Sequence, residues 1–180
     1  MLMRSNSNPK TMRKDDITEP MNTWDNFYQS RVCNNIYVNA FCKKYNRFIE
    51  EIIVNIQQIS YNLKTPLILK EEGCGIGTVS LAISQIGERL FNSFGLTDSS
   101  DTKKISKVVF SDINIPMLEL CCKNTLSIST DNYFGKAPLF YAKENICEPK
   151  FFESFTVVVT HGVLEHFSDE DITRIMSTYN

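Results

Sequence analysis

The chain has 180 residues, of which 42% are hydrophobic and 22% are charged, and its net charge is −2 at neutral pH. A chain of this length and composition is expected to bury one globular core, which excludes wholesale disorder. The slight excess of acidic residues argues against a surface built to bind nucleic acid. We therefore expect a folded single domain without a nucleic-acid partner.

Residues 1–20 are rich in Ser, Asn, Pro and charge, and we expect them to form a flexible tail. The opening run MLMRSNSNPK lacks the apolar stretch of a signal peptide, and no segment approaches the roughly 20 apolar residues of a membrane span. The six cysteines show no CxxC pair and no zinc-type spacing. We expect a cytoplasmic protein with reduced thiols, no membrane contact and no metal site.

The hydrophobic pattern changes its period along the chain. Over residues 21–62 apolar residues recur every three to five positions, which predicts one or two helices. Short apolar runs then predict four strands, at 67–69, 108–110, 139–141 and 155–159. Helical patterns follow the first, second and fourth of these runs, at 79–91, 115–126 and 168–180. Short apolar strands that alternate with helices indicate a parallel sheet covered on both faces. The sequence thus predicts an α/β fold with an N-terminal helical region, 21–62, and a doubly wound, mostly parallel sheet within 66–180.

A glycine-rich segment, EEGCGIG at 71–77, lies between the first predicted strand and the following helix. Glycine at the carboxyl end of such a strand lets the backbone turn tightly and approach a ligand. A dinucleotide fingerprint, Gly-x-Gly-x-x-Gly, would place its third glycine at Thr78. The carboxylate of Glu71 would repel a pyrophosphate but suits a ligand with sulfonium and ammonium groups. The segment favours such a ligand over NAD, and a plain glycine turn is the alternative.

This segment resembles motif I of the class I S-adenosylmethionine-dependent methyltransferases, and later landmarks of that family follow in order. The resemblance covers roughly residues 20–180. It implies a Rossmann-like fold with strand order 3-2-1-4 in the visible part, S-adenosylmethionine as the cofactor, and methyl transfer as the reaction.

The resemblance also implies which residues bind the cofactor. Asp112, at the end of VVFSD, matches the acid whose carboxylate accepts hydrogen bonds from both ribose hydroxyls. An acid favoured at a helix N-terminus is the alternative interpretation of Asp112. Asn145 stands where the family usually has an acid for the adenine, and Glu144 is a fallback for that contact; either residue could instead be an ordinary loop residue. The implied set is Glu71, Gly73, Gly75, Gly77, Asp112, Ile113, Asn145, Ile146 and His161.

The segment 160–167 resembles the family's motif IV, which lines the methionine side of the cofactor. His161 is a candidate catalytic base, since an unperturbed histidine has a pKa of about 6.5. Methyl transfer, however, often needs little beyond alignment at roughly 3 Å. His161 and His166 are the only histidines, and their spacing does not fit a zinc motif. Trp24 or Tyr28 could contact the sulfonium, or could belong to the core.

The family sheet usually has seven strands in the order 3-2-1-4-5-7-6, whereas the last predicted helix of this chain follows the fourth strand. The resemblance therefore implies a C-terminally truncated domain whose fourth strand presents an open edge for self-association. The leading hypothesis is a methyltransferase that acts on a small molecule more readily than on a protein. The alternatives are an inactive S-adenosylmethionine-binding module or fragment, and an NAD-dependent oxidoreductase.

Overall fold

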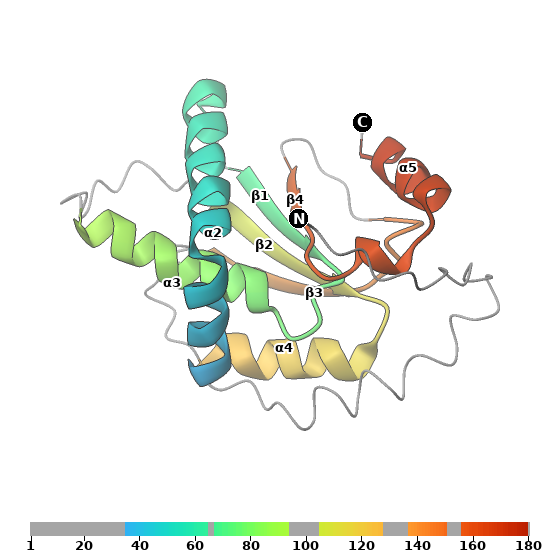
Figure 1. The fold of residues 1–180 in the computed structure, drawn as a ribbon, viewed down its shortest axis with the longest axis horizontal. Coiled ribbons are helices and arrows are strands. Elements are labelled where there is room, and N and C mark those ends of the chain that lie inside the picture. The colour runs from blue at the N-terminus through green and yellow to red at the C-terminus, as the bar shows by residue number, and fades with distance from the viewer. Residues whose placement is uncertain (1–34, 65–66, 94–104, 128–136, 151–155, 180) are drawn as a thin grey trace, which may run out of the picture.

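The computed structural model describes residues 35–64, 67–93, 105–127, 137–150 and 156–179 (Figure 1). Helices and strands alternate up to the third strand, and η2 is a short 3-10 helix. In chain order the elements are α2 (Asn35–Leu63), β1 (Leu67–Glu72), α3 (Thr78–Ser93), β2 (Ile105–Asp112), α4 (Ile115–Ser127), β3 (Leu139–Lys143), β4 (Thr156–Val159), η2 (Leu164–His166) and α5 (Asp169–Ser177). The predicted tail, Trp24 and Tyr28 lie outside the described residues.

The four strands form one parallel sheet in the order β3-β2-β1-β4. This order confirms the predicted one. The chain passes outward from β1 to β2 and β3, and β4 then pairs with the opposite side of β1. In such a sheet a ligand binds outside the carboxyl ends of the strands, where the order reverses. The glycine-rich segment follows β1 and therefore lies at that place.

The two faces of the sheet differ in chemistry. Leu67 and Leu69 of β1 belong to the hydrophobic core, together with residues of α2, α3 and α4. Because side chains alternate along a strand, Lys70 and Glu72 lie on the other face. Figure 1 shows α2, α3 and α4 on one side of the sheet and α5 on the other. The sheet is thus doubly wound.

β1 is longer than the apolar run that predicted it. The run ended at Leu69, but β1 continues to Glu72, and all six of its residues are buried. The difference arises because Lys70, Glu71 and Glu72 have charged or hydrogen-bonded partners inside the protein, which permits their burial. The glycine turn therefore begins directly at the end of a buried strand.

The longest helix, α2, places a buried stripe against the core. Val38, Cys42, Ile49, Ile53 and Ile56 form this stripe. The helix is kinked at Tyr45, whose φ of −113° and ψ of 19° are not helical. Among the helices within the described ranges, none combines the length and the apolar character that crossing a bilayer requires.

Polar side chains cap the N-termini of two helices. Ser168 precedes α5, and its hydroxyl oxygen accepts a hydrogen bond from the N–H of Asp171 at 3.1 Å. Asn114 precedes α4, and its Oδ1 accepts from the N–H of Met117 at 3.3 Å. Such caps satisfy N–H groups that have no partner within the helix. The start of α4 is thereby fixed close to the end of β2, where Asp112 lies.

Candidate functional site

The turn after β1 requires glycine at two positions for steric reasons. Gly73 and Gly77 have φ of 61° and 80°, a left-handed conformation that favours glycine. A Cβ on Gly73 would lie 2.5 Å from Cγ2 of Val163, and one on Gly77 would lie 2.7 Å from Sγ of Cys121. The turn thus packs closely against both α4 and the segment after β4. Gly75 lies between them, with a φ of 51°.

Glu71 connects the glycine turn to the start of α3. Its Oε1 accepts a hydrogen bond from the N–H of Val79 at 3.1 Å, and its Oε2 accepts from the N–H of Ser80 at 2.9 Å. Burial raises the pKa of Glu71 to about 7, although the hydrogen bonds from Ser80 and Val79 oppose this rise. Glu71 therefore fixes the turn through α3, with its carboxylate facing the start of that helix.

Asp112 lies opposite the turn, at the end of the neighbouring strand. Its Oδ2 accepts a hydrogen bond from the N–H of Gly75, and its Oδ1 accepts from the N–H of Asn114, both at 2.8 Å. Burial raises the pKa of Asp112, and the hydrogen bonds from Asn114 and Gly75 lower it. An ionised carboxylate has about four acceptor positions, so both oxygens keep capacity for further donors. The predicted ribose acid is thus held against the glycine turn.

The segment after β3 lies beside Asp112. The N–H of Glu144 donates to the backbone oxygen of Asp112 at 3.0 Å. Asn145 is half-buried, and its Oδ1 accepts from the N–H of Cys147 at 3.0 Å, while Ile146 is buried. Ile113 is 38% exposed on the same edge of the sheet. The structure thus brings the predicted ribose and adenine residues together.

The fallback assignment of Glu144 to the adenine is wrong. Its side chain is only 4% exposed, and its Oε2 lies 2.9 Å from Nζ of Lys70. Lys70 belongs to the face of the sheet opposite the core. An ion pair between residues so far apart in the chain leaves no local signal, so the sequence pattern did not reveal it.

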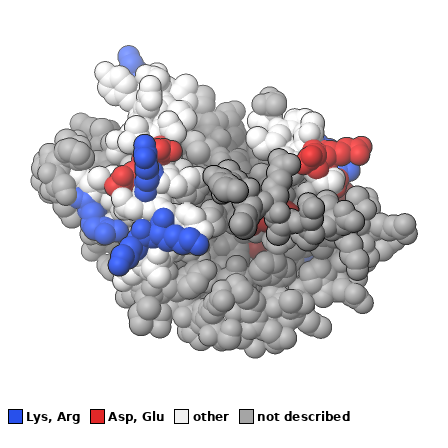
Figure 2. All heavy atoms as spheres, in the orientation of Figure 1, with Lys and Arg blue, Asp and Glu red and all other residues white. Residues whose placement is uncertain are grey.

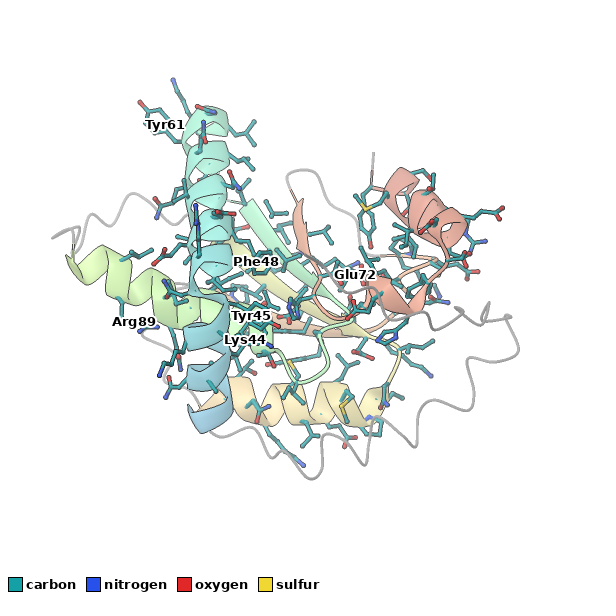
Figure 3. All side chains as sticks on the ribbon, viewed as in Figure 1. Lys44, Tyr45, Phe48, Tyr61, Glu72 and Arg89 are labelled. Carbon is teal, nitrogen blue, oxygen red and sulfur yellow. The ribbon has the colours of Figure 1, made fainter. Side chains whose placement is uncertain are left out.

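His161 lies beyond β4, among aromatic rings of α2. Its ring centroid is 5.2 Å from that of Phe41, 4.8 Å from that of Tyr45 and 6.1 Å from that of Phe48. Nζ of Lys44 lies 5.0 Å from the centroid of the Tyr45 ring. Figure 3 shows Tyr45 and Phe48 on the part of α2 that crosses the sheet. These aromatic contacts, which the sequence did not predict, hold the loop after β4 against the kinked part of α2.

Exposed basic and exposed acidic side chains gather on different helices. Figure 2 shows basic side chains gathered over α2 and α3, and the main group of acidic side chains over α5. The exposed residues concerned include Lys43, Lys44 and Arg47 of α2 and Asp169 and Glu170 of α5. Within the described segments, no three His, Cys, Asp or Glu side chains are grouped so that they could hold a metal ion.

The sheet order, the glycine turn after β1 and the acid at the end of β2 define a Rossmann-like domain with the fold of the class I S-adenosylmethionine-dependent methyltransferases. The chain is similar in fold to magnesium protoporphyrin IX methyltransferase from Synechocystis PCC 6803 with bound S-adenosylmethionine. The TM-score is 0.56 and the sequence identity 15%, over 95% of this chain and 72% of that one.

Two further solved structures have the same fold. The same Synechocystis enzyme with bound S-adenosylhomocysteine gives a TM-score of 0.54 at 15% identity, over 91% of this chain and 65% of that one. The bifunctional kinase-methyltransferase WbdD gives 0.51 at 17% identity, over 75% of this chain and 26% of that one. No family model matches the chain, and no curated protein is detectably similar to it in sequence.

Proposed function

We propose that the chain binds S-adenosylmethionine at the carboxyl ends of β1, β2 and β3 and transfers its methyl group to a small molecule. One observation carries this proposal. The left-handed glycine turn after β1 is joined to the carboxylate of Asp112 on β2 by the N–H of Gly75, at 2.8 Å. This hydrogen bond lies at the carboxyl ends of the strands, where a doubly wound sheet binds its ligand.

The residues of this edge fit the parts of the cofactor. The remaining acceptor positions of Asp112 suit the two ribose hydroxyls, and the exposed side chain of Ile113 suits one face of the adenine. Asn145 and Ile146 would border the adenine from the next strand. The carboxylate of Asp112 favours a ligand with sulfonium and ammonium charge, whereas the carboxylate of Glu71 faces the start of α3 and fixes the turn. When bound, S-adenosylmethionine supplies a methyl group that its sulfonium already activates.

The acceptor side of the proposed site is the segment after β4. Val163 contacts the glycine turn at Gly73, and His161 is exposed two residues earlier. The exposure of His161 supports a role in orienting an acceptor, and a histidine can also accept a proton from an acceptor hydroxyl. Phe48, which is 39% exposed, offers an apolar surface close to His161. These features support a small acceptor with an apolar body.

The second candidate function is an S-adenosylmethionine-binding module without turnover. The hydrogen bond between Gly75 and Asp112 supports cofactor binding in itself, so it agrees with this function as well.

An S-adenosylhomocysteine release assay separates the two functions. The purified chain is incubated with S-adenosylmethionine and a panel of small aromatic and aliphatic acceptors, with the Asp112→Ala variant as the control. A methyltransferase releases S-adenosylhomocysteine in an acceptor-dependent manner, and the variant releases far less. Binding of S-adenosylmethionine without release on any acceptor favours the binding module, and absence of binding contradicts both functions.

A further inference from the structure

A lysine and two glutamates are buried together behind the glycine turn, and we call Lys70, Glu72 and Glu144 the ion cluster. Nζ of Lys70 lies 2.5 Å from Oε1 of Glu72 and 2.9 Å from Oε2 of Glu144. The exposed fractions of the three residues are 0%, 1% and 4%. Figure 3 labels Glu72, near the end of β1 on the side toward α5. The cluster combines one cation with two carboxylates inside the protein.

Hydrogen bonds extend the ion cluster to other segments. The hydroxyl of Ser111 on β2 donates to Oε2 of Glu72 at 2.5 Å. The hydroxyl of Tyr179, beyond α5, donates to Oε1 of Glu72 at 3.2 Å. The N–H of Lys150 donates to Oε1 of Glu144. The cluster therefore joins β1, β2, the segment after β3 and the end of α5.

Residues of the ion cluster are direct sequence neighbours of residues of the proposed cofactor site. Three cluster or cluster-bound residues each directly precede a site residue, in the pairs Glu72–Gly73, Ser111–Asp112 and Glu144–Asn145. Ser111 and Asp112 are successive residues of β2, so their side chains point to opposite faces of the sheet. The cluster connects the ends of these strands through Ser111, Glu72, Lys70 and Glu144, next to the residues assigned to the cofactor.

Stability alone does not account for such a cluster. Removing charges from water is costly, and well-packed uncharged residues of similar volume often stabilise a fold at least as well. A network of short, directed contacts instead fixes the relative positions of the segments that it joins. We infer that the ion cluster is a positioning unit that sets the spacing between the glycine turn and residues 144–146, so that both ends of S-adenosylmethionine are held at once. This inference rests on the proposed function.

The test removes the charges of the ion cluster while keeping the side-chain volumes. The variant combines Lys70→Met, Glu72→Gln and Glu144→Gln. The matched control combines Arg47→Met and Glu51→Gln, an exposed pair on α2 whose Nε–Oε1 distance is 3.6 Å. Calorimetry measures the affinity for S-adenosylhomocysteine and for 5′-methylthioadenosine, which lacks the amino-acid end. Melting curves and circular dichroism show that each protein is folded.

We expect the triple variant to fold and to bind S-adenosylhomocysteine about 10- to 100-fold more weakly than the wild type, because a small misplacement of two binding segments is costly. Its affinity for 5′-methylthioadenosine is expected to fall by less than about threefold, since that ligand does not depend on the spacing. The surface control is expected to bind both ligands as the wild type does. If the triple variant does not fold, Glu144→Gln alone replaces it, because the Lys70–Glu72 pair then stays balanced in charge.

Two results overturn the inference. One is a folded variant that binds S-adenosylhomocysteine with wild-type affinity, and the other is an equal loss of affinity for the two ligands. If the wild type itself fails to bind S-adenosylhomocysteine, the proposed function is wrong, and the inference falls with it. The wild-type titration thus distinguishes the two failures.

Discussion

Replacing Asp112 by alanine tests the ribose contact and the joint between β1 and β2 together. The carboxylate accepts hydrogen bonds from Gly75 and Asn114, and its free acceptor positions are the ones assigned to the ribose hydroxyls. A hydrogen bond to a charged group contributes about 1.5–3 kcal/mol. Losing the net contribution of one such contact weakens binding roughly 10- to 150-fold. Calorimetric titration with S-adenosylhomocysteine measures this loss directly.

Two matched variants separate the ribose contact from other effects of Asp112→Ala. Asn114→Ala removes the cap of α4 at the same strand end, which costs about 1 kcal/mol of stability, and is expected to leave the affinity near that of the wild type. His161→Ala is expected to lower turnover modestly and to change the affinity much less than Asp112→Ala does. A folded Asp112→Ala variant that binds S-adenosylhomocysteine normally would refute the ribose assignment.

Three further predictions concern the turn, the pH dependence and the sheet edge. Gly73 has a φ of 61°, and a Cβ added there would lie 2.5 Å from Val163, so Gly73→Ala is expected to lower the unfolding free energy by about 2–5 kcal/mol in urea titrations. Adding Val163→Ala is expected to recover the part that is due to the clash. No recovery would mean that the two residues are not in contact. Burial raises the pKa of Glu71 from 4.5 to about 7, so its contribution to stability is fully present below pH 4.5 and is lost as the pH rises through 7. Urea titrations should show that the unfolding free energy falls by about 3 kcal/mol between pH 4.5 and 7. If Glu71→Gln shows the same dependence of unfolding free energy on pH, the assignment of this dependence to Glu71 is wrong. We also propose self-association through the edge of β4, for which light scattering after size-exclusion chromatography is expected to show a dimer or larger species; a monomer at all concentrations would speak against it.

The sequence predicted the strands and the place of the site because both depend on local signals, whereas the strand order was implied by the resemblance to the methyltransferase family. The apolar runs mark the strands, and the glycines of 71–77 need left-handed backbone wherever they occur. Asp112 directly follows a predicted strand, so the topology alone brings it to the glycine turn. These features require no knowledge of distant contacts.

The features that the sequence did not predict all depend on contacts between distant segments. From the sequence, Lys70 and Glu72 look like the polar end of a strand. In the structure they are buried, because Glu144 pairs with Lys70 and Tyr179 donates a hydrogen bond to Glu72. The kink of α2 at Tyr45 likewise coincides with ring contacts to His161, far along the chain. A hydrophobic period describes which face of an element is buried, but not which charged partners meet there.

The central claim is that the edge formed by the glycine turn and Asp112 is a site for S-adenosylmethionine. Calorimetric titration of the wild-type chain with S-adenosylhomocysteine and, separately, with NADH tests it most directly. The account predicts saturable binding of S-adenosylhomocysteine at one site per chain, which an excess of NADH does not displace. Tighter binding of NADH than of S-adenosylhomocysteine would contradict the account and would make the chain a dinucleotide-binding protein.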